Sequence, residues 1–153
     1  MQVRDIMSKN VAFCHPDTGL PDVARMMVDM DCGEIPVVDA SRVPIGVITD
    51  RDITCRAVAK GMDALAMRAE DCMTSPAVTV TPEATLEECC QVLEANRVRR
   101  VPVVDDEGVC CGMVSQAHIA LHAPKTETAE VVRTLSKPAP LPASRLVSEL
   151  PIL

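Results

Sequence analysis

The sequence contains one pattern in two copies, 66 positions apart. Pro36–Asp39 reads Pro-Val-Val-Asp, and the same residues return as Pro102–Asp105. Without any gap, segments 3–53 and 69–119 share 11 identical residues among 51 positions, where average composition would give about three. Solenoids stack several shorter units, so a long unit that occurs only twice does not form one. We therefore expect a single domain built from two similar halves that pack on each other.

Each copy predicts the same order of elements, β-α-β-β-α, and hence an α/β fold. Apolar residues recur at helical spacing over 20–30 and 86–93, and Thr85 with Glu88 has the spacing of a capping box. A short β-prone segment precedes each of these helices, and two β-prone runs follow it. The expected β segments are Val11–Cys14, Ile35–Val38 and Ile45–Ile48 in the first copy, and Val78–Val80, Val101–Val104 and Met113–Ser115 in the second.

The copies and their flanks divide the chain into segments. These are residues 1–61 for the first copy, 62–68 for a linker, 69–123 for the second copy, and 124–153 for a C-terminal helix and a proline-rich tail. We expect the last helix of the first copy to begin near Thr49 and to stop at Gly61, and its counterpart to begin near Ser115. A terminal helix is expected at Thr128–Ser136, before the prolines of the tail.

Composition argues against several classes of partner. Phe13 is the only aromatic residue, and 22 acidic residues against 15 basic ones give a net charge of −7. Single-stranded nucleic acids stack on aromatic rings and duplexes need clustered cations, so we expect no nucleic-acid partner. The N-terminus has no apolar export segment, and no run is long and apolar enough to span a membrane. We expect a cytoplasmic protein with reduced thiols that contacts no membrane.

Three motifs recur in the same order in both copies. They are Asp-x-Met (Asp5–Met7 and Asp71–Met73), aliphatic-Pro-Val-Val-Asp (Ile35–Asp39 and Val101–Asp105), and Gly-x-x-Thr-x-x-Asp, which is complete at Gly46, Thr49 and Asp52. Each motif alone is weak, but their order and spacing are repeated. In these features the chain resembles the tandem CBS-domain pair, named after cystathionine β-synthase. The resemblance covers about residues 3–122.

Membership of that family implies a CBS pair, an α/β module with two clefts between pseudo-symmetric halves. Such modules typically form homodimers shaped as a flat disc. They bind adenosine-containing ligands such as AMP, ATP, NAD or S-adenosylmethionine, and they sense a signal and pass it on rather than catalyse a reaction. The resemblance thus implies no catalytic residues, no cofactor and no resident metal, and it implies an effector protein that receives the output.

Thr49 and Asp52 lie where a strand is expected to turn into a helix. Free backbone N–H groups and the positive end of the helix dipole favour an anion at such a turn. A threonine hydroxyl can donate to a phosphate, while a carboxylate only accepts and can take ribose hydroxyls. The same Thr-x-x-Asp spacing is also that of a capping box, in which the two side chains only cap the helix. The sequence leaves both interpretations open.

The resemblance implies that each cleft combines this motif of one half with residues before the Pro-Val-Val strand of the other half. The first cleft is then expected to bind its ligand through Thr49, Asp50, Asp52, Ala77, Val78, Arg99 and Arg100. The two arginines suit phosphate, because a guanidinium can donate two charge-assisted hydrogen bonds. The second cleft, formed by Gly33, Glu34, Ser115 and His118, is expected to be weaker for AMP-like ligands. There Glu34 replaces an arginine and repels phosphate, so the cleft is empty, takes a less anionic ligand, or uses His118 as a pH-sensitive contact.

Two other functions remain open. One is a protein–protein interaction module whose clefts bind no ligand and whose disc face and tail dock another protein. The other is a redox or metal sensor built on the cysteines, of which Cys89–Cys90 and Cys110–Cys111 form adjacent pairs. Adjacent cysteines are awkward ligands for one tetrahedral metal, and their counterparts in the first copy are apolar. We therefore expect Cys89 and Cys90 on a core-facing side of a helix, and Cys110 at the start of a strand.

Overall fold

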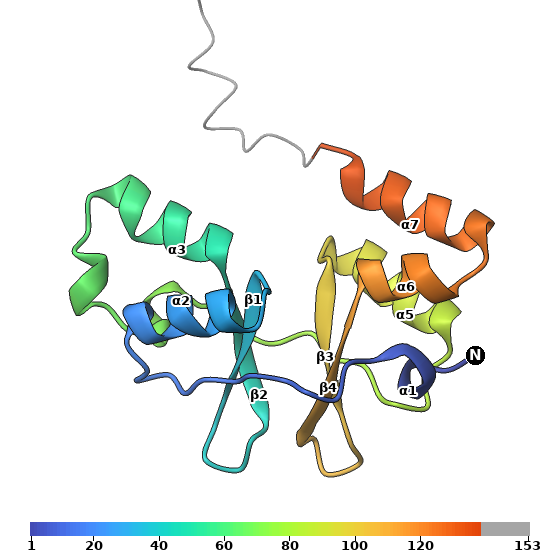
Figure 1. Ribbon diagram of the computed structural model, residues 1–153, viewed down its shortest axis with the longest axis horizontal. Helices are drawn as coiled ribbons and strands as arrows, with labels where there is room; N and C mark the ends of the chain where they lie inside the picture. Colours follow the sequence, from blue (N-terminus) through green and yellow to red (C-terminus); the bar gives the residue numbers. More distant parts are fainter. Residues whose placement is uncertain (139–153) are drawn as a thin grey trace, which may run out of the picture.

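The computed structural model describes residues 1–138, which form two similar halves that lie side by side (Figure 1). The expected proline-rich tail lies mostly outside the described residues. The first half contains α2 (Leu20–Asp29), β1 (Glu34–Val38), β2 (Pro44–Thr49) and α3 (Asp50–Arg56), followed by short 3-10 turns at Val58–Lys60 and Ala64–Ala66. The second half contains α5 (Leu86–Asn96), β3 (Arg100–Val104), β4 (Cys110–Ser115) and α6 (Gln116–His122). Each half thus has one antiparallel hairpin with helices packed on it, in the order that the repeat predicts.

The hairpins have matching registers. Glu34 lies opposite Thr49 in the first hairpin, and Arg100 lies opposite Ser115 in the second. The start of one strand is therefore beside the end of its partner, where the following helix begins. This places the residues expected to bind ligand at the same end of both hairpins.

The first β-prone segment of each copy is shorter than expected. Only Cys14 and Val80 pair there, each through a single parallel bridge to the following hairpin. Cys14 accepts from the N–H of Val38, but Pro36 has no N–H with which to continue that ladder toward Ala12. Pro102 limits the pairing of Val80 in the same way.

Two helix boundaries also differ from expectation. The helix that begins after Thr49 ends at Arg56 and not at Gly61; the buried Ala57, with φ of −112°, caps it and is followed by a 3-10 turn in place of further α-helix. Gly61, with φ of 66°, closes the separate 3-10 turn that follows. The terminal helix α7 (Lys125–Ser136) begins three residues before the expected start at Thr128. It packs on α5 and α6 (Figure 1), and its Val131 is buried in the core of the second half.

The short helices α1 (Val3–Ile6) and α4 (Ala69–Cys72) each pack on the half that does not follow them in sequence. The N–H of Val3 donates to the carbonyl of Ala84 at 2.9 Å, and that of Ala69 donates to the carbonyl of Thr18 at 2.8 Å. In Figure 1 the blue α1 lies beside the yellow and orange elements of the second half. The halves are therefore joined by an exchange of segments as well as by the contact between them.

Each half has its own apolar core. The core of the second half contains Val3 and Ile6 of α1 together with residues of α5, β3, β4 and α6, among them Cys89, Cys90, Leu93, Val101, Val114 and Ile119. The core of the first half receives Ala69 and Cys72 from α4 and is otherwise built from Cys14, Leu20, Val23, Met27, Ile35, Val37, Ile48 and Ala57. The burial of Cys89 and Cys90 and the position of Cys110 at the start of β4 confirm the prediction for these cysteines. Within residues 1–138 no helix combines the length and apolar character needed to cross a bilayer.

The repeated glycines Gly46 and Gly112 each lie where another segment of the chain passes close to a hairpin strand. A Cβ at Gly46 would lie 2.7 Å from the carbonyl oxygen of Thr74, and one at Gly112 would lie 2.7 Å from the sulfur of Met7. The segments that approach are held by backbone pairs, Val47 with Thr74 and Ser8 with Met113. At Gly46 the nearest atom belongs to the backbone, so only a residue without a side chain allows this approach.

We therefore expect Gly46→Ala to destabilise the protein by about 1–3 kcal/mol, because the nearest obstacle is backbone and cannot rotate away. Urea unfolding followed by circular dichroism measures the change. Gly19→Ala is the matched control, since a Cβ there would meet only Pro21 at 3.7 Å. Equal effects of the two substitutions would contradict this account of Gly46.

Candidate functional site

Thr49 and Asp52 are positioned by the turn from β2 into α3. The hydroxyl of Thr49 accepts from the N–H of Asp52 at 3.0 Å, and the carboxylate of Asp52 accepts from the N–H of Thr49 at 3.0 Å. The capping box that the sequence left open is thus formed. A carboxylate has further lone pairs, so capping by one oxygen does not use up Asp52.

The carboxylate of Asp52 also reaches the other half of the molecule. The hydroxyl of Thr74 lies 3.4 Å from its Oδ1, and the guanidinium of Arg56 lies 3.7 Å from the same oxygen. Arg56 in turn donates to the carbonyls of Cys72 and Met73, both at 2.8 Å. Asp52 therefore faces the segment that leads from α4 toward Ala77.

A cavity of about 510 Å³, here called the first cleft, lies between the two halves. It is lined by Gly33, Glu34, Thr49, Asp50, Arg51, Arg97, Val98, Arg99, Arg100 and Leu135. Its charged side chains are four arginines against two carboxyls. The surplus of guanidinium groups attracts anions, although the chain as a whole is acidic.

Most residues expected in the first cleft line it: Thr49, Asp50, Arg99 and Arg100. Asp52 is not among the lining residues, because its carboxylate turns toward Thr74. Ala77 and Val78 are not among them either, and Val78 packs against the core of the second half. Gly33, expected in the second cleft, lines the first instead.

Close packing at the start of α3 places Gly33 in the first cleft. The N–H of Asp50 donates to the carbonyl of Gly33 at 3.1 Å, and a Cβ on Gly33 would lie 2.9 Å from the Asp50 carboxylate. The next residue, Glu34, lines both clefts, as does Arg100. Glu34 and Arg100 occupy equivalent positions in the two copies and form the wall that the clefts share.

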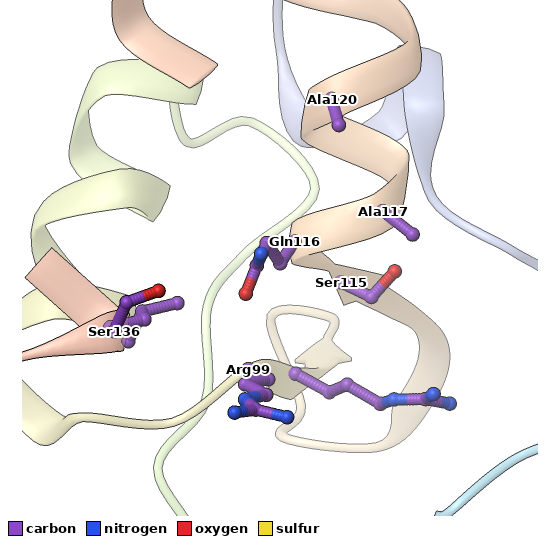
Figure 2. Close-up of a pocket in the computed structure, with 8 residues that line it drawn as sticks. Arg99, Ser115, Gln116, Ala117, Ala120 and Ser136 are labelled. Atoms are coloured by element: carbon purple, nitrogen blue, oxygen red, sulfur yellow. The ribbon is translucent and has the colours of Figure 1, made fainter. Parts of the chain in front are cut away.

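A neighbouring hollow of about 400 Å³ shares Arg99, Arg100 and Leu135 with the first cleft. Figure 2 shows Gln116 at the start of α6, Ser136 at the end of α7 and Arg99 around this hollow, with Ala117 and Ala120 farther along α6. Arg97 holds the end of α7, donating to the carbonyl of Lys137 at 2.9 Å. Sequence reasoning missed this contribution, because the helical pattern of α7 does not say where the helix docks.

A second cavity of about 270 Å³, here called the second cleft, lies on the other side of the shared wall. Glu34, Ser115 and His118 line it as expected, together with Arg100 and with the mainly apolar residues Val11, Ala12, Ile35 and Met113. The hydroxyl of Ser115 accepts from the N–H of His118 at 3.2 Å and so caps α6. This cleft is smaller than the first and has fewer cations.

Burial changes the titration of two groups in the second cleft. Burial raises the pKa of Glu34 from its usual 4.5 to about 7, with nearby Arg100 lowering it and Asp52 raising it. Burial also lowers the pKa of His118, and the neighbouring His122 and Arg100 act in the same direction. His118 is therefore neutral near pH 7, and Glu34 is close to half ionised.

Five of the eight cysteines are buried. Burial raises the pKa of Cys14 to about 11 and that of Cys89 to about 12, so both thiols stay protonated at neutral pH. The thiolate is the reactive and metal-binding form, which disfavours a redox role for these two. In the described part of the chain, no three His, Cys, Asp or Glu side chains are grouped as a metal site.

Comparison with known proteins finds a family match for both copies of the repeat. A family model described as CBS domain matches residues 3–57 and 69–125. Hypoxic response protein 1 of Mycobacterium tuberculosis is 30% identical over 138 residues, which span 90% of this chain and 96% of the relative.

Solved structures show the same arrangement. A crystal structure of Hypoxic Response Protein I with two coordinated zinc ions has a TM-score of 0.73 at 31% identity, covering 81% of this chain and 100% of that one. The CBS domain pair of protein MJ0100, in complex with 5′-methylthioadenosine and S-adenosyl-L-methionine, has a TM-score of 0.72 at 25% identity, covering 79% of this chain and 98% of that one.

Proposed function

The chain belongs to the CBS-domain family, and from this premise we propose that it is a regulatory module that binds an adenosine-containing nucleotide, AMP, ATP or NAD, in the first cleft. The observation that carries the proposal is the set of four arginines around that cleft, Arg51, Arg97, Arg99 and Arg100. Each guanidinium can donate charge-assisted hydrogen bonds to phosphate. The related CBS pair of protein MJ0100 binds two adenosine compounds, which supports an adenosine ligand here.

Different residues of the first cleft contact the phosphate and the ribose of the nucleotide. Arg99 and Arg100 hold the phosphate, and Thr49 donates its hydroxyl to it, as residues of this type do at phosphate sites. Asp52 accepts from the ribose hydroxyls once its carboxylate turns from Thr74 toward the cleft. Binding that bridges the halves shifts the balance between their packing arrangements, and this shift is the signal.

The output requires an effector protein, because the residues of the clefts supply binding groups and no reaction. Homodimer formation is part of the same proposal. Homodimers are typical of the family, and Val28, Val58 and Leu121 are exposed apolar side chains that such an interface would cover. A module that only docks proteins, with no ligand in the first cleft, is the alternative.

We expect AMP, ADP, ATP or NAD to stabilise the protein in a dye-based thermal-shift assay, by about 2.7 kcal/mol when the ligand is at 100 times its Kd. Arg99→Ala should weaken this binding about tenfold or more, because a hydrogen bond to a charged group contributes about 1.5–3 kcal/mol. Raising the salt concentration should weaken it as well. Isothermal titration calorimetry gives the affinities.

Arg25→Ala is the matched control, since Arg25 is exposed on α2 and paired with Asp22 at 2.8 Å, away from the first cleft. It should leave nucleotide affinity unchanged. Stabilisation by none of the four nucleotides would reject the proposal in favour of the docking module. Equal affinities for wild type and Arg99→Ala would show that the phosphate lies elsewhere.

A further inference from the structure

Helix α7 is an addition to the CBS pair. It begins at Lys125, where the match to the CBS-domain model ends, and it runs to Ser136. In the first half, the equivalent helix α3 is followed by the short 3-10 turns at Val58–Lys60 and Ala64–Ala66 in place of such a helix. The repeated architecture does not require α7, so its role must follow from where it docks.

The C-terminal half of α7 is anchored on the core of the second half. Val131 is 1% exposed, and Leu135, four residues later on the same face of the helix, packs against the same core. This docking brings the end of α7 to the first cleft. Leu135 lines both the first cleft and the neighbouring hollow, and Ser136 borders that hollow together with Arg99 (Figure 2).

Arg97 joins the end of α7 to the first cleft. Its side chain lines the cleft, and its Nη2 donates to the carbonyls of Lys137 and Pro138 at 2.9 and 3.2 Å. A guanidinium holds a phosphate with two parallel hydrogen bonds, from Nη1 and Nη2 or from Nε and Nη2. Both pairs include Nη2, whose two hydrogens are directed to the two carbonyls. Arg97 therefore offers neither pair to a phosphate while the end of α7 is docked.

The end of α7 also opposes an anion in the first cleft. The last carbonyls of a helix carry a partial negative charge, which a nearby cation stabilises and a nearby anion destabilises. Arg97 is such a cation for α7, and a phosphate in the first cleft is such an anion. The docked helix end and a bound phosphate therefore compete for the same guanidinium.

We propose that α7 is an autoinhibitory strap, whose last turn competes with the phosphate of the ligand for Arg97. Nucleotide binding draws Arg97 into the first cleft and releases the last turn of α7, to which an effector protein can then bind. Docking of α7 weakens nucleotide binding by the same factor, because coupling between two binding events is reciprocal. The inference rests on the proposed function of the first cleft, and it adds the element that carries the signal out of the CBS pair.

Val131→Ala in the full chain tests this competition by loosening α7. Val131 is not among the residues that line the first cleft or the hollow beside it. We expect the variant to bind AMP and ATP about fivefold more tightly than wild type in isothermal titration calorimetry, the lower end of the usual range of coupling. A purely structural effect of the substitution would weaken binding instead, so the direction of the change is diagnostic.

Val132→Ala is the matched control for Val131→Ala. Val132 lies on the same helix, is 37% exposed, and is not among the residues that line the first cleft or the hollow. The same truncation at this position removes little buried surface and should leave both nucleotide affinities unchanged.

Amide hydrogen exchange measures the release of α7 itself. Saturation with ATP should slow exchange around the first cleft and quicken it in residues 131–137. Arg97→Ala should quicken exchange in residues 131–137 without nucleotide, and ATP should then change it no further. Arg51→Ala is the control, because Arg51 is a cation of the same cleft at the start of α3. It should weaken ATP binding and leave the exchange of α7 in the nucleotide-free protein unchanged.

The outcomes separate the strap from the proposed function. ATP that binds wild type and slows exchange in residues 131–137, or a Val131→Ala variant that binds no more tightly than wild type, would overturn the strap and leave nucleotide binding intact. Binding of AMP and ATP to Val131→Ala but not to wild type would support the strap. If neither protein binds AMP or ATP, the phosphate site of the proposed function fails together with the strap.

Discussion

Ile6→Ala is expected to destabilise the protein by about 2–5 kcal/mol, although Ile6 belongs to a helix of only four residues near the N-terminus. Ile6 is 7% exposed and packs into the core of the second half. Truncating it removes buried apolar surface and leaves a cavity that its neighbours fill only in part. Small domains have about 5–15 kcal/mol of stability in total, so the loss is a large share. Urea unfolding at constant pH measures it.

The half of the protein that Ile6→Ala destabilises is as informative as the size of the stability loss. Because α1 packs on α5 and α6 and not on α2, amide hydrogen exchange should quicken first in the second half. Val28→Ala is the control, since Val28 is 79% exposed and its truncation should change stability by less than about 0.5 kcal/mol. A loss below about 1 kcal/mol for Ile6→Ala, or faster exchange confined to the first half, would contradict the exchange of segments.

The repeat predicted the fold well where the signal is local. The hairpin strands, the capping box at Thr85 and the buried face of Cys89 all follow from spacing along a short stretch of chain. The exchange of α1 and α4 could not be predicted in this way. The apolar pattern of Val3 and Ile6 says that they are buried, but the identity of the half that buries them is a long-range property.

The site was predicted through the family resemblance more than through residue chemistry. Arg99 and Arg100 were expected in the first cleft and line it, because the first residue of β3 and the residue before it lie between the halves. The capping box of Thr49 and Asp52 was foreseen only as an alternative. The burial of Glu34 was not foreseen, since a glutamate at the start of a strand is ordinarily exposed and nothing local indicates a shared wall.

Glu34→Gln is expected to stabilise the protein at neutral and alkaline pH and to do so progressively less as the pH falls. Burial raises the pKa of Glu34 from 4.5 to about 7 in the folded protein. Each pKa unit is equivalent to about 1.36 kcal/mol, so the difference corresponds to about 3 kcal/mol. Glutamine keeps the size of the side chain and cannot ionise.

The sign of this pH dependence follows from the number of protons that the folded and unfolded states bind. Between pH 4.5 and about 7 the folded protein holds a proton on Glu34 that the unfolded chain has released. The stabilising contribution of the protonated carboxyl is fully present below pH 4.5, and it is lost as the pH rises through about 7. His118 acts in the opposite direction, because its lowered pKa means that the folded state releases its proton first. A pH profile of wild type alone therefore mixes both effects.

The difference between Glu34→Gln and wild type separates them, since His118 is present in both proteins. Free energies of unfolding measured at several pH values should show this difference growing by about 3 kcal/mol from about pH 4.5 to about pH 8. Glu88→Gln should differ from wild type by a nearly constant amount over this range, because hydrogen bonds from the backbone and hydroxyl of Thr85 lower the pKa of Glu88 and so move its pH dependence below pH 4.5. A difference that stays constant with pH would mean that Glu34 is ionised throughout, with Arg100 compensating its charge.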